Sequence, residues 1–252
     1  MNNAVDSSGH TDLRGSHSLT ESALPGRSGQ RLGQRVLGVL KDRILEGRYA
    51  RGSRISIEEV KTEFGVSKQP VMDAMRRLEA IGIVQIVPQS GCRLSTYTAT
   101  EVEDFFRLFG SFEGEIAAAA AARRTDDQLP ELDAAWQRIE DLEALDDSDQ
   151  RSRGYRLLNR DFHLAIHHMA HSRVMAELSE RMWDMSDFLI NTVGGPHSLS
   201  GAVHDRNHDH DLIRNAIRTG NVEIARVAME SHIVGTVRHL GSDDEARRIR
   251  PA

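Results

Sequence analysis

Between residues 31 and 94 the spacing of apolar residues changes from helical to strand-like, and this order of elements leaves few possible folds. A first helix, ending at Gly47, is predicted by apolar residues spaced four apart: Leu32, Val36, Leu40 and Ile44. The residues at 51–53 mark a turn. Ser56 and Glu59 then fit a capping box at the start of a short helix that ends at Phe64.

The next two elements are a third helix and a hairpin. Ser67 is placed to cap a helix that ends at Gly82 and whose apolar side carries Val71, Met75, Leu78 and Ile81. Residues 83–87 and 92–94 are short β-branched stretches around the turn Pro88-Gln89-Ser90-Gly91, and they predict a hairpin. Helix, helix, tight turn, helix and hairpin is the order of a winged helix-turn-helix.

The charge of the chain is distributed unevenly. Residues 31–98 contain 12 Lys and Arg against 7 Asp and Glu, whereas residues 99–252 contain 18 against 28. A basic first region followed by an acidic one is typical of a DNA-binding head joined to a body that does not contact DNA. Solvated surfaces also differ in charge by chance, so the charge alone only favours this interpretation.

Composition places the protein in the cytoplasm. No apolar run approaches the roughly 20 residues that cross a bilayer, and no basic start followed by an apolar core predicts a secretory signal. The single cysteine, Cys92, excludes an intrachain disulfide and suits a reducing compartment. We therefore expect a soluble cytoplasmic protein that does not bind membranes.

Beyond residue 100 only helices are predicted. Apolar periodicity favours helices at about 100–123, 129–146, 152–171, 173–193, 202–219 and 221–240. Because the connections are short, neighbouring helices should pack antiparallel in an all-α bundle. The expected fold is mainly α, with a disordered tail at 1–30, a winged helix-turn-helix with a small β-hairpin wing at 31–97, the antiparallel bundle at 98–242 and a second tail at 243–252.

The third predicted helix is the recognition helix of the head. In this motif it lies in the major groove and presents its N-terminal residues to base edges. The expected DNA contacts come from its polar side and from the wing: Ser67, Lys68, Gln69, Met72, Arg76, Arg77, Ser90, Gly91 and Arg93. Gln69 can pair with adenine, and Lys68 can reach guanine or a phosphate. A winged domain that makes only protein contacts is the alternative.

Twelve histidines are many for a chain of 252 residues, and most of them lie beyond residue 160. Asn159, His163 and His167 are spaced four apart on one helical face, and His171 continues the row. Further histidines follow as His204, His208 and His210, and as His232 and His239. Histidines that face one another across a bundle can bind Zn²⁺ and similar ions, although an isolated histidine is more often on the surface or hydrogen-bonded in a core.

The head resembles the GntR family of bacterial regulators. The resemblance rests on Gly47-Arg48-Tyr49, Gly52-Ser53-Arg54-Ile55, the run from Phe64 to Met75, Leu78, Gly82-Ile83-Val84 and Pro88-Gln89-Ser90-Gly91, and it covers nearly all of residues 31–97. Where the family usually has Ser-Arg-x-Pro-Val-Arg-Glu-Ala-Leu, this chain has Lys68 and Met72 in place of the two arginines. Methionine cannot fork onto guanine or phosphate, so the family's usual operator is not expected here. As a hypothesis, Met72 instead contacts a thymine methyl group.

Residues 101–240 look like the FCD ligand-binding domain of the FadR subgroup. Many of its members hold a metal with Asp-x-x-x-His on one helix and two histidines on the last two helices. The resemblance therefore implies a divalent metal ion, with zinc as the expected ion, held by Asn159, His163, His210 and His232. Asn159 replaces the usual aspartate and is a poorer donor, so a polar pocket without metal is the alternative. His167 and His171 are expected to lie outside the site.

The resemblance also implies a small-molecule effector. Three histidines with an open coordination position would let a small carboxylate complete the metal shell. Family members often place an arginine four residues before the glutamate that aligns with Glu113, but here that position is Phe109. Arg107, which is nearby, is the candidate to bind the effector in its place.

The favoured function is a homodimeric transcription regulator, expected to be a repressor, whose two heads bind a pseudo-palindromic operator in double-stranded DNA. Effector binding in the bundle would change the operator affinity. Two alternatives are a regulator that senses the metal itself and a histidine-metal hydrolase. The sequence contains no His-Glu-x-x-His, no Gly-x-Ser-x-Gly and no phosphate-binding glycine loop, so an enzyme is not expected.

Overall fold

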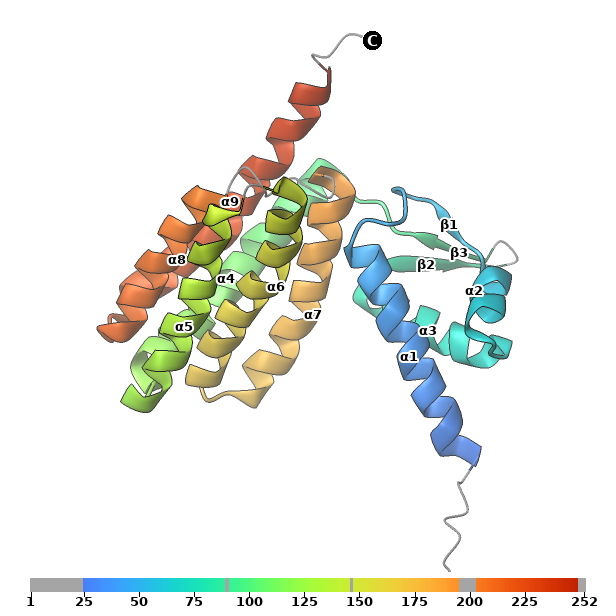
Figure 1. Ribbon diagram of the computed structural model, residues 1–252, viewed down its shortest axis with the longest axis horizontal. Coiled ribbons are helices and arrows are strands. Elements are labelled where there is room, and N and C mark those ends of the chain that lie inside the picture. The colour runs from blue at the N-terminus through green and yellow to red at the C-terminus, as the bar shows by residue number, and fades with distance from the viewer. Residues whose placement is uncertain (1–24, 89–90, 146, 195–202, 249–252) are drawn as a thin grey trace, which may run out of the picture.

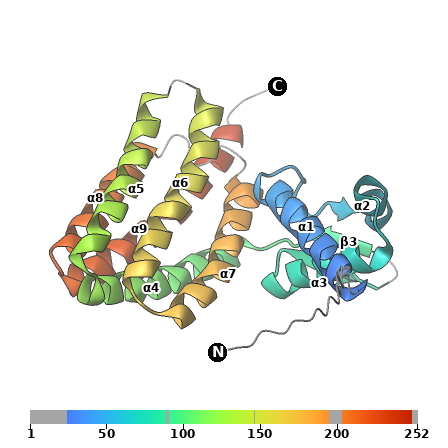
Figure 2. The ribbon, with the colours of Figure 1, turned by 60° about the horizontal axis from the view of Figure 1, so that its bottom comes forward.

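The computed structural model describes residues 25–88, 91–145, 147–194 and 203–248. A small head, made of helices α1 to α3 and a three-stranded sheet, lies beside a larger helical bundle (Figure 1). Helices α1 and α7 are in contact where the two parts meet, as Figure 2 also shows. The expected fold class, a winged helix-turn-helix followed by an all-α bundle, is confirmed.

Helix α1, Pro25–Leu45, begins six residues before the expected start at Arg31. Residues 25–30 are therefore helical, although they were assigned to the disordered tail. The helix begins with Pro25, and proline is well tolerated at the first position of a helix. The rest of that predicted tail, residues 1–24, lies outside the described residues. Of the predicted apolar row, Val36, Leu40 and Ile44 are buried, whereas Leu32 is 38% exposed because this end of α1 extends beyond the head (Figure 1).

The other two helices of the head are α2, Ile57–Phe64, and α3, Lys68–Ile81. The hydroxyl of Ser56 accepts a hydrogen bond from the N–H of Glu59 at 3.2 Å, which is the first half of the predicted capping box. Ser67 occupies the cap position of α3, but its side chain makes no capping hydrogen bond. The reason is the third residue of the helix, Pro70, which has no N–H to donate.

The sheet has the strand order β1-β3-β2, with both pairs antiparallel. Strands β2, Val84–Val87, and β3, Gly91–Leu94, form the predicted hairpin. Strand β1, Arg54–Ile55, was not predicted, because two residues are too few to show an alternating pattern. In the centre of the sheet Cys92 pairs with residues of both neighbouring strands and is only 1% exposed.

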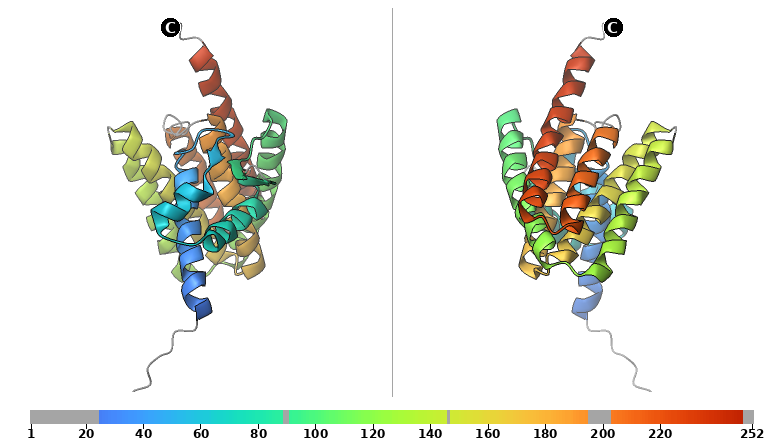
Figure 3. Two further views of the ribbon diagram at one scale, coloured as in Figure 1. Left: turned by 90° about the vertical axis from the view of Figure 1, so that its right-hand side faces the viewer. Right: turned by 90° about the vertical axis from the view of Figure 1, so that its left-hand side faces the viewer.

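The bundle contains α4 (Ala99–Arg123), α5 (Leu129–Glu140), α6 (Ser148–Met169), α7 (Arg173–Leu189), α8 (Val203–Arg218) and α9 (Val222–Arg248). Short helical turns join or extend them: η1 (Asp126–Gln128), η2 (Asp141–Ala144) and the π-helical η3 (Ile190–Gly194). Helix α9 continues beyond the expected end at residue 240 and so includes part of the second predicted tail. Its last turns project from the bundle (Figure 3).

Helices α4 and α9 make the most extensive contact between two elements of the bundle. Helix α4 begins at a complete capping box, in which Thr98 and Glu101 satisfy each other's backbone N–H. Two glycines one turn apart let α9 approach closely. A methyl group at Gly110 would lie 3.1 Å from the carbonyl oxygen of Glu230, and one at Gly114 would lie 3.0 Å from that of Arg226. No helix of the described residues is long and apolar enough to cross a membrane.

Candidate functional site

Three buried histidines meet inside the bundle. His163 lies on α6, His210 on α8 and His232 on α9, and all three are 0% exposed. Their ligand atoms lie within 4.8 Å of one another, and Nε2 of His210 is 3.1 Å from Nε2 of His232. We call these three residues the histidine cluster. Phe162 and Trp183 pack against it, with ring centroids 4.7 Å from His210 and 4.5 Å from His163, respectively.

Carboxylates lie behind two of these imidazoles. Oδ2 of Asp209 is 3.3 Å from Nδ1 of His232, a contact that puts the ring proton on Nδ1 and leaves the lone pair on Nε2. Oε2 of Glu113 is 3.5 Å from Nδ1 of His163. Carboxylates in such positions fix the tautomer and the orientation of metal-binding histidines.

Glu113 on α4 is completely buried and contacts both the histidine cluster and a second polar group, His167 and Ser179. Its carboxylate accepts hydrogen bonds from Nε2 of His167, at 3.0 and 3.2 Å to its two oxygens, and from the hydroxyl of Ser179. Burial by itself raises the pKa of Glu113, but its contacts with His163 and His167 outweigh burial and lower the pKa to about 2. His167 therefore faces Glu113, next to the histidine cluster but outside it.

Asn159, the expected fourth ligand, lies one turn before His163 and is 7% exposed. Its Oδ1 accepts a hydrogen bond from the hydroxyl of Tyr155 at 3.2 Å. That hydroxyl in turn accepts a hydrogen bond from Nε of Arg206 at 2.7 Å. The amide oxygen of Asn159 therefore already has one partner, and it keeps a second lone pair for another.

The histidine cluster fits a divalent metal ion. Burial lowers the pKa of His163, and it lowers the pKa of His210 and His232 well below the usual value, so the three imidazoles are neutral at pH 7. Nε2 of His163 and Nδ1 of His210 have no hydrogen-bond partner among the described residues, and Nδ1 of His163 has only the 3.5 Å contact with Glu113. Neutral, converging imidazoles with unpaired nitrogens are the donors that zinc and similar ions prefer.

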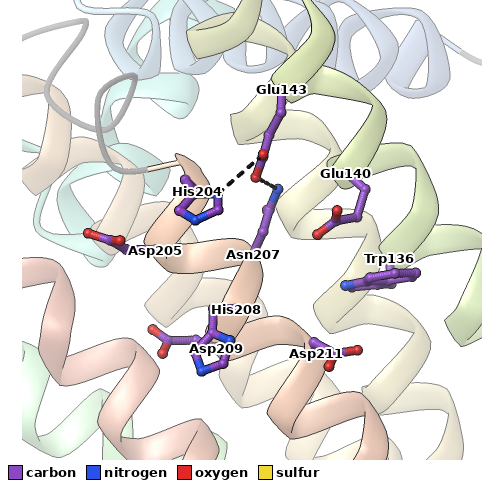
Figure 4. A pocket seen from close by; sticks show the side chains of 9 residues that line it. All are labelled: Trp136, Glu140, Glu143, His204, Asp205, Asn207, His208, Asp209 and Asp211. Carbon is purple, nitrogen blue, oxygen red and sulfur yellow. Dashed lines mark hydrogen bonds and ion pairs between the residues drawn. The ribbon is translucent and has the colours of Figure 1, made fainter.

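The other histidines of the described residues lie outside the histidine cluster. His204 and His208 are on the outer side of α8, where they line a surface pocket of about 500 Å³ opposite Trp136 of α5 and Glu143 of η2 (Figure 4). Nδ1 of His204 is 3.3 Å from the carboxylate of Glu143. His171 is exposed in the turn after α6. Spacing in the sequence alone therefore did not distinguish the clustered histidines from these.

The side chain of Arg107 does not reach the histidine cluster. It is 71% exposed on the outer side of α4 and pairs with Asp104 at 2.7 Å. Phe109, which stands where family members often have an arginine, is completely buried. The position of Arg107 therefore does not support its expected role in binding an effector.

The polar side of α3 is at the surface of the head. Ser67, Lys68, Gln69, Arg76 and Arg77 are exposed, and Met72 is half-buried. Oδ1 of Asp73 accepts hydrogen bonds from Gln69 at 2.9 Å and from Arg76 at 2.8 Å. Both side chains would have to leave Asp73 to pair with a base, which costs little because exposed contacts of this kind are weak.

The wing presents a second cationic surface. In the register of the sheet Arg93 lies between Arg54 and Gln85, and it donates to Oε1 of Gln85 at 3.3 Å. Gly91 has a φ of 93°, which glycine adopts without strain. Ser90 lies outside the described residues. Arg54 was missed because only the register of strand β1 reveals that it neighbours Arg93.

One ion pair joins the head to the bundle, and further ion pairs between α6 and α7 adjoin it. Nζ of Lys41 on α1 is 2.9 Å from one carboxylate oxygen of Asp184 on α7, and Arg160 on α6 is 3.0 Å from the other. Asp187, one turn further along α7, is 3.4 Å from Arg160 and 3.8 Å from Arg156. We call these five residues the junction network. Asp184 and Asp187 are 4% and 6% exposed, so these contacts are largely shielded from water.

Helix α6 connects the junction network to the histidine cluster. Arg156 directly follows Tyr155, and Arg160 directly follows Asn159, so neighbouring residues of one helix serve the two groups. A nearby contact reinforces the junction, because the side-chain amide of Asn191 donates to the backbone carbonyl of Leu45, the last residue of α1, at 2.5 Å. Helices α1 and α6 therefore hold the same carboxylate of α7, that of Asp184.

A winged helix-turn-helix joined to a helical domain with a buried polar site defines a two-domain transcription regulator. The sequence matches the gntR family of bacterial regulatory proteins over residues 32–94 and the FCD domain over residues 104–235. The chain belongs to the GntR family of transcription regulators and carries an FCD domain after its head. Its relatives are transcriptional regulators and not enzymes, so the hydrolase alternative is set aside.

Two relatives named as regulators and one solved structure show how similar the chain is to known proteins. The Uxu operon regulator of Haemophilus influenzae is 28% identical over 224 residues, which are 82% of this chain and 79% of the relative. The transcriptional repressor GlaR of Escherichia coli is 23% identical over 200 residues, which are 77% and 89% of the two chains. The solved structure of Escherichia coli McbR/YncC shares the fold, with a TM-score of 0.68 and 19% identity over 84% of this chain and 98% of that one.

Two buried charged residues near the histidine cluster were missed by the sequence analysis as functional residues. Glu113 carried a signal, because it continues the row of apolar residues Phe106 and Phe109 at helical spacing, on the side of α4 that is buried. Arg206 carried none that stands out, because it lies in the polar run His204-Asp205-Arg206-Asn207-His208, which looks like a solvated surface.

Proposed function

We propose that this regulator is a cytoplasmic, homodimeric repressor whose operator affinity changes when a small anionic molecule binds in the bundle. Relatives that are named repressors support the direction of control. The proposed DNA contacts are those expected from the sequence on α3 and the wing, with Arg54 added because it neighbours Arg93. Residues 31–97 and 98–242 would act as DNA-binding and effector-binding domains, respectively.

The proposal includes a divalent metal ion, with zinc as the expected ion, held by His163, His210 and His232 and completed by Asn159. The observation that carries it is the convergence of three neutral, buried imidazoles in the bundle that lies beside the head. When bound, the ion would supply positive charge and an open coordination position for an anionic oxygen. Asp209 and Glu113 would orient His232 and His163 from behind.

The junction network supports a route from this site to the head. Helix α6 carries two of the proposed ligands, and its arginines hold Asp184 and Asp187 on α7. Asp184 also holds Lys41 of α1. A ligand that shifts α6 would therefore change how α1 is held, and with it the spacing of the two heads on DNA.

The test is a titration of operator DNA with purified protein. Labelled DNA from the upstream region of its own gene is titrated in the presence of excess nonspecific competitor, at several salt concentrations and with or without zinc. We expect specific binding that survives the competitor and weakens with salt, as phosphate contacts require. Binding that the competitor abolishes, for every fragment of the genome tested, would contradict the proposed function.

Metal content is measured on the same samples. His210→Ala removes one ligand and should abolish stoichiometric zinc, whereas His208→Ala changes an exposed histidine of the same helix and should not. Equal zinc content in the two variants would contradict the metal site. Zinc that is held weakly and by itself changes operator affinity would instead identify a metal sensor, a behaviour favoured by the neutral Asn159.

A further inference from the structure

Arg206 on α8 is a buried cation without a paired anion. It is 3% exposed and lies one turn before His210. Its guanidinium donates hydrogen bonds to the hydroxyl of Tyr155 at 2.7 Å, to Oγ1 of Thr236 at 3.1 Å and to Nε2 of His232 at 3.1 Å. All three partners are neutral, and no carboxylate forms an ion pair with it among the described residues.

An unpaired buried charge is costly, so this arrangement calls for a counter-charge. Asp209 lies near enough for the charge of Arg206 to lower its pKa, although burial has the larger effect and raises that pKa. Its carboxylate contacts Nδ1 of His232 and not the guanidinium. The protein therefore holds a guanidinium beside the histidine cluster and leaves its charge without a direct anionic partner.

Arg206 and a metal ion would compete for the same atom. Because Asp209 faces Nδ1 of His232, the single lone pair of that ring is on Nε2. This atom faces both Nη2 of Arg206 and Nε2 of His210, each at 3.1 Å. A metal ion that takes this lone pair releases the N–H of Arg206. Metal binding would thus free a donor next to the ion.

We propose that Arg206 recognises the carboxylate of the effector, in the role that Arg107 does not fill. The inference rests on the proposed effector site and deepens it. A guanidinium binds a carboxylate through two parallel hydrogen bonds, and its charge adds to that of a metal ion nearby. Phe162 and Trp183 are buried and pack against His210 and His163, so aromatic side chains surround this part of the site. The proposed ligand class is an organic carboxylate, and an inorganic anion is the comparison in the test.

The competing explanation is that Arg206 only ties helices together. Its partners Tyr155 on α6 and Thr236 on α9 would allow that role. The two explanations differ in their effect on metal binding. A recognition residue that repels the metal should, when its charge is removed, leave zinc affinity equal or higher, whereas loss of a structural tie should weaken zinc and carboxylate binding together.

The experiment compares Arg206→Gln and Arg206→Lys with wild type by calorimetry. The probes are zinc alone, then citrate, succinate and inorganic phosphate, each with and without zinc. The matched control is Arg214→Gln on the same helix, since Arg214 is paired with Asp211 at 2.7 Å and stacks on Trp136 away from the cluster. Thermal unfolding of every variant reports whether the fold is retained.

We expect at least one carboxylate to bind wild type more tightly with zinc than without it, and more tightly than phosphate. Arg206→Gln should weaken that carboxylate about 10- to 100-fold, the usual effect of losing hydrogen bonds to a charged group. The same variant should bind zinc at least as tightly as wild type. Arg214→Gln should change neither affinity. Arg206→Lys keeps the charge without the fork and should weaken the carboxylate less than Arg206→Gln.

The outcomes separate this inference from the proposed metal site. Zinc binding without any carboxylate binding, or carboxylate binding that is equal in wild type and Arg206→Gln, would overturn the role of Arg206 and leave the metal site standing. Carboxylate binding that depends on Arg206 in a protein that binds no zinc would do the reverse. If Arg206→Gln does not fold, Arg206→Lys decides: wild-type carboxylate affinity, or parallel loss of zinc and carboxylate, would overturn the inference.

Discussion

Glu113 and Asp187 are both buried carboxylates, yet their surroundings shift their pKa values in opposite directions. Glu113 accepts hydrogen bonds from His167 and Ser179, and its pKa falls to about 2 despite burial. Asp187 meets its arginines only at 3.4 and 3.8 Å. Burial is the largest influence on Asp187 and raises its pKa to about 6. Close hydrogen bonds to the charged form therefore decide which of the two remains ionised at acidic pH.

The first prediction concerns Asp187→Asn and its dependence on pH. The unfolded chain titrates Asp187 near 3.8 and the folded chain near 6, so between these values the folded protein binds more protons. Its contribution to stability is present below pH 3.8 and is lost as the pH rises through 6. Asparagine mimics the neutral carboxyl, so the variant should gain stability relative to wild type as the pH rises, reaching on the order of 3 kcal/mol at pH 8.

Urea unfolding at pH 4, 6 and 8 measures this difference for the two proteins. Asp161→Asn is the control, because Asp161 lies on the surface of α6 with 54% of its side chain exposed and touches only Arg138, at 3.8 Å. The control should show no comparable trend with pH. A stability difference between Asp187→Asn and wild type that stays constant, or shrinks as the pH rises, would contradict the prediction.

At the scale of elements, the packing of α4 on α9 shows a balance between helix propensity and close approach. Glycine in a helix interior costs about 1 kcal/mol relative to alanine. Gly110 and Gly114 nevertheless lie in the middle of α4, because any larger side chain would press on the backbone of α9. The residues that follow, 117–121, are all buried alanines, whose small side chains also permit close packing of α4.

The second prediction is that alanine at both glycines destabilises the bundle. A Cβ at Gly110 would also meet Cγ2 of Val234 at 2.9 Å, so α9 must move in addition to its side chains. Overpacking typically costs about 1–3 kcal/mol per site, which exceeds the gain in helix propensity. Gly235→Ala is the control, because nothing lies within 4 Å of its Cβ position and the substitution should stabilise α9. Thermal unfolding that rises for the double variant as it does for the control would contradict this account.

At the scale of the whole molecule, the head and the bundle share polar contacts in addition to apolar ones. Besides the ion pair of Lys41 with Asp184, the side-chain amide of Asn191 donates to the carbonyl of Leu45. The ring of Tyr97, whose hydroxyl donates to the carbonyl of Gly82 inside the head at 2.8 Å, packs edge-on against Phe188 of α7. Direct contacts of this kind can transmit a change only if the two parts have more than one arrangement. In the junction network Arg160 contacts both Asp184 and Asp187, and Asp184 also contacts Lys41 of the head.

The third prediction is that Lys41→Met uncouples the head from the bundle. Asp184 keeps Arg160 when Lys41 is removed, so the bundle should remain folded. We expect the effect of zinc and carboxylate on operator affinity to shrink, out of a coupling free energy that is typically about 1–3 kcal/mol. Arg43→Met is the control, because Arg43 lies on the same helix but pairs with Glu63 inside the head. Fluorescence anisotropy with labelled operator measures both, and an unchanged ligand effect in Lys41→Met would exclude this route.

The parts of the fold that follow from local patterns could be predicted from the sequence. Helical periodicity, glycine stops and the Pro88–Gly91 turn located α2, α3, the β2–β3 hairpin and the bundle helices to within a few residues, except at the end of α9, which continues to Arg248. Strand β1 could not be predicted, because it exists only through its pairing with β3. Ser67 takes the predicted cap position of α3, but its hydroxyl makes no capping hydrogen bond, and Pro70 has no N–H for it to bind.

The candidate site was predictable only in part. The spacing of His163, His210 and His232, read with the family resemblance, named residues that the structure brings together. The carboxylates and the guanidinium around them could not be assigned, because Glu113, Asp209 and Arg206 meet the cluster across helices that are distant in the sequence. Arg107 was chosen for its nearness to a family position, but it lies two residues from Phe109, and two residues along a helix turn a side chain by about 200°.

Cys92, enclosed between β1 and β2 in the sheet of the head, is the only thiol of the chain. Burial raises its pKa and keeps reagents from it, so an alkylating agent can modify only molecules whose head has opened. The rate of Cys92 alkylation in native protein therefore reports how often the head alone opens, because the bundle contains no cysteine. Measuring this rate with and without a ligand bound in the bundle would show, without any DNA, how much the bundle stabilises the head.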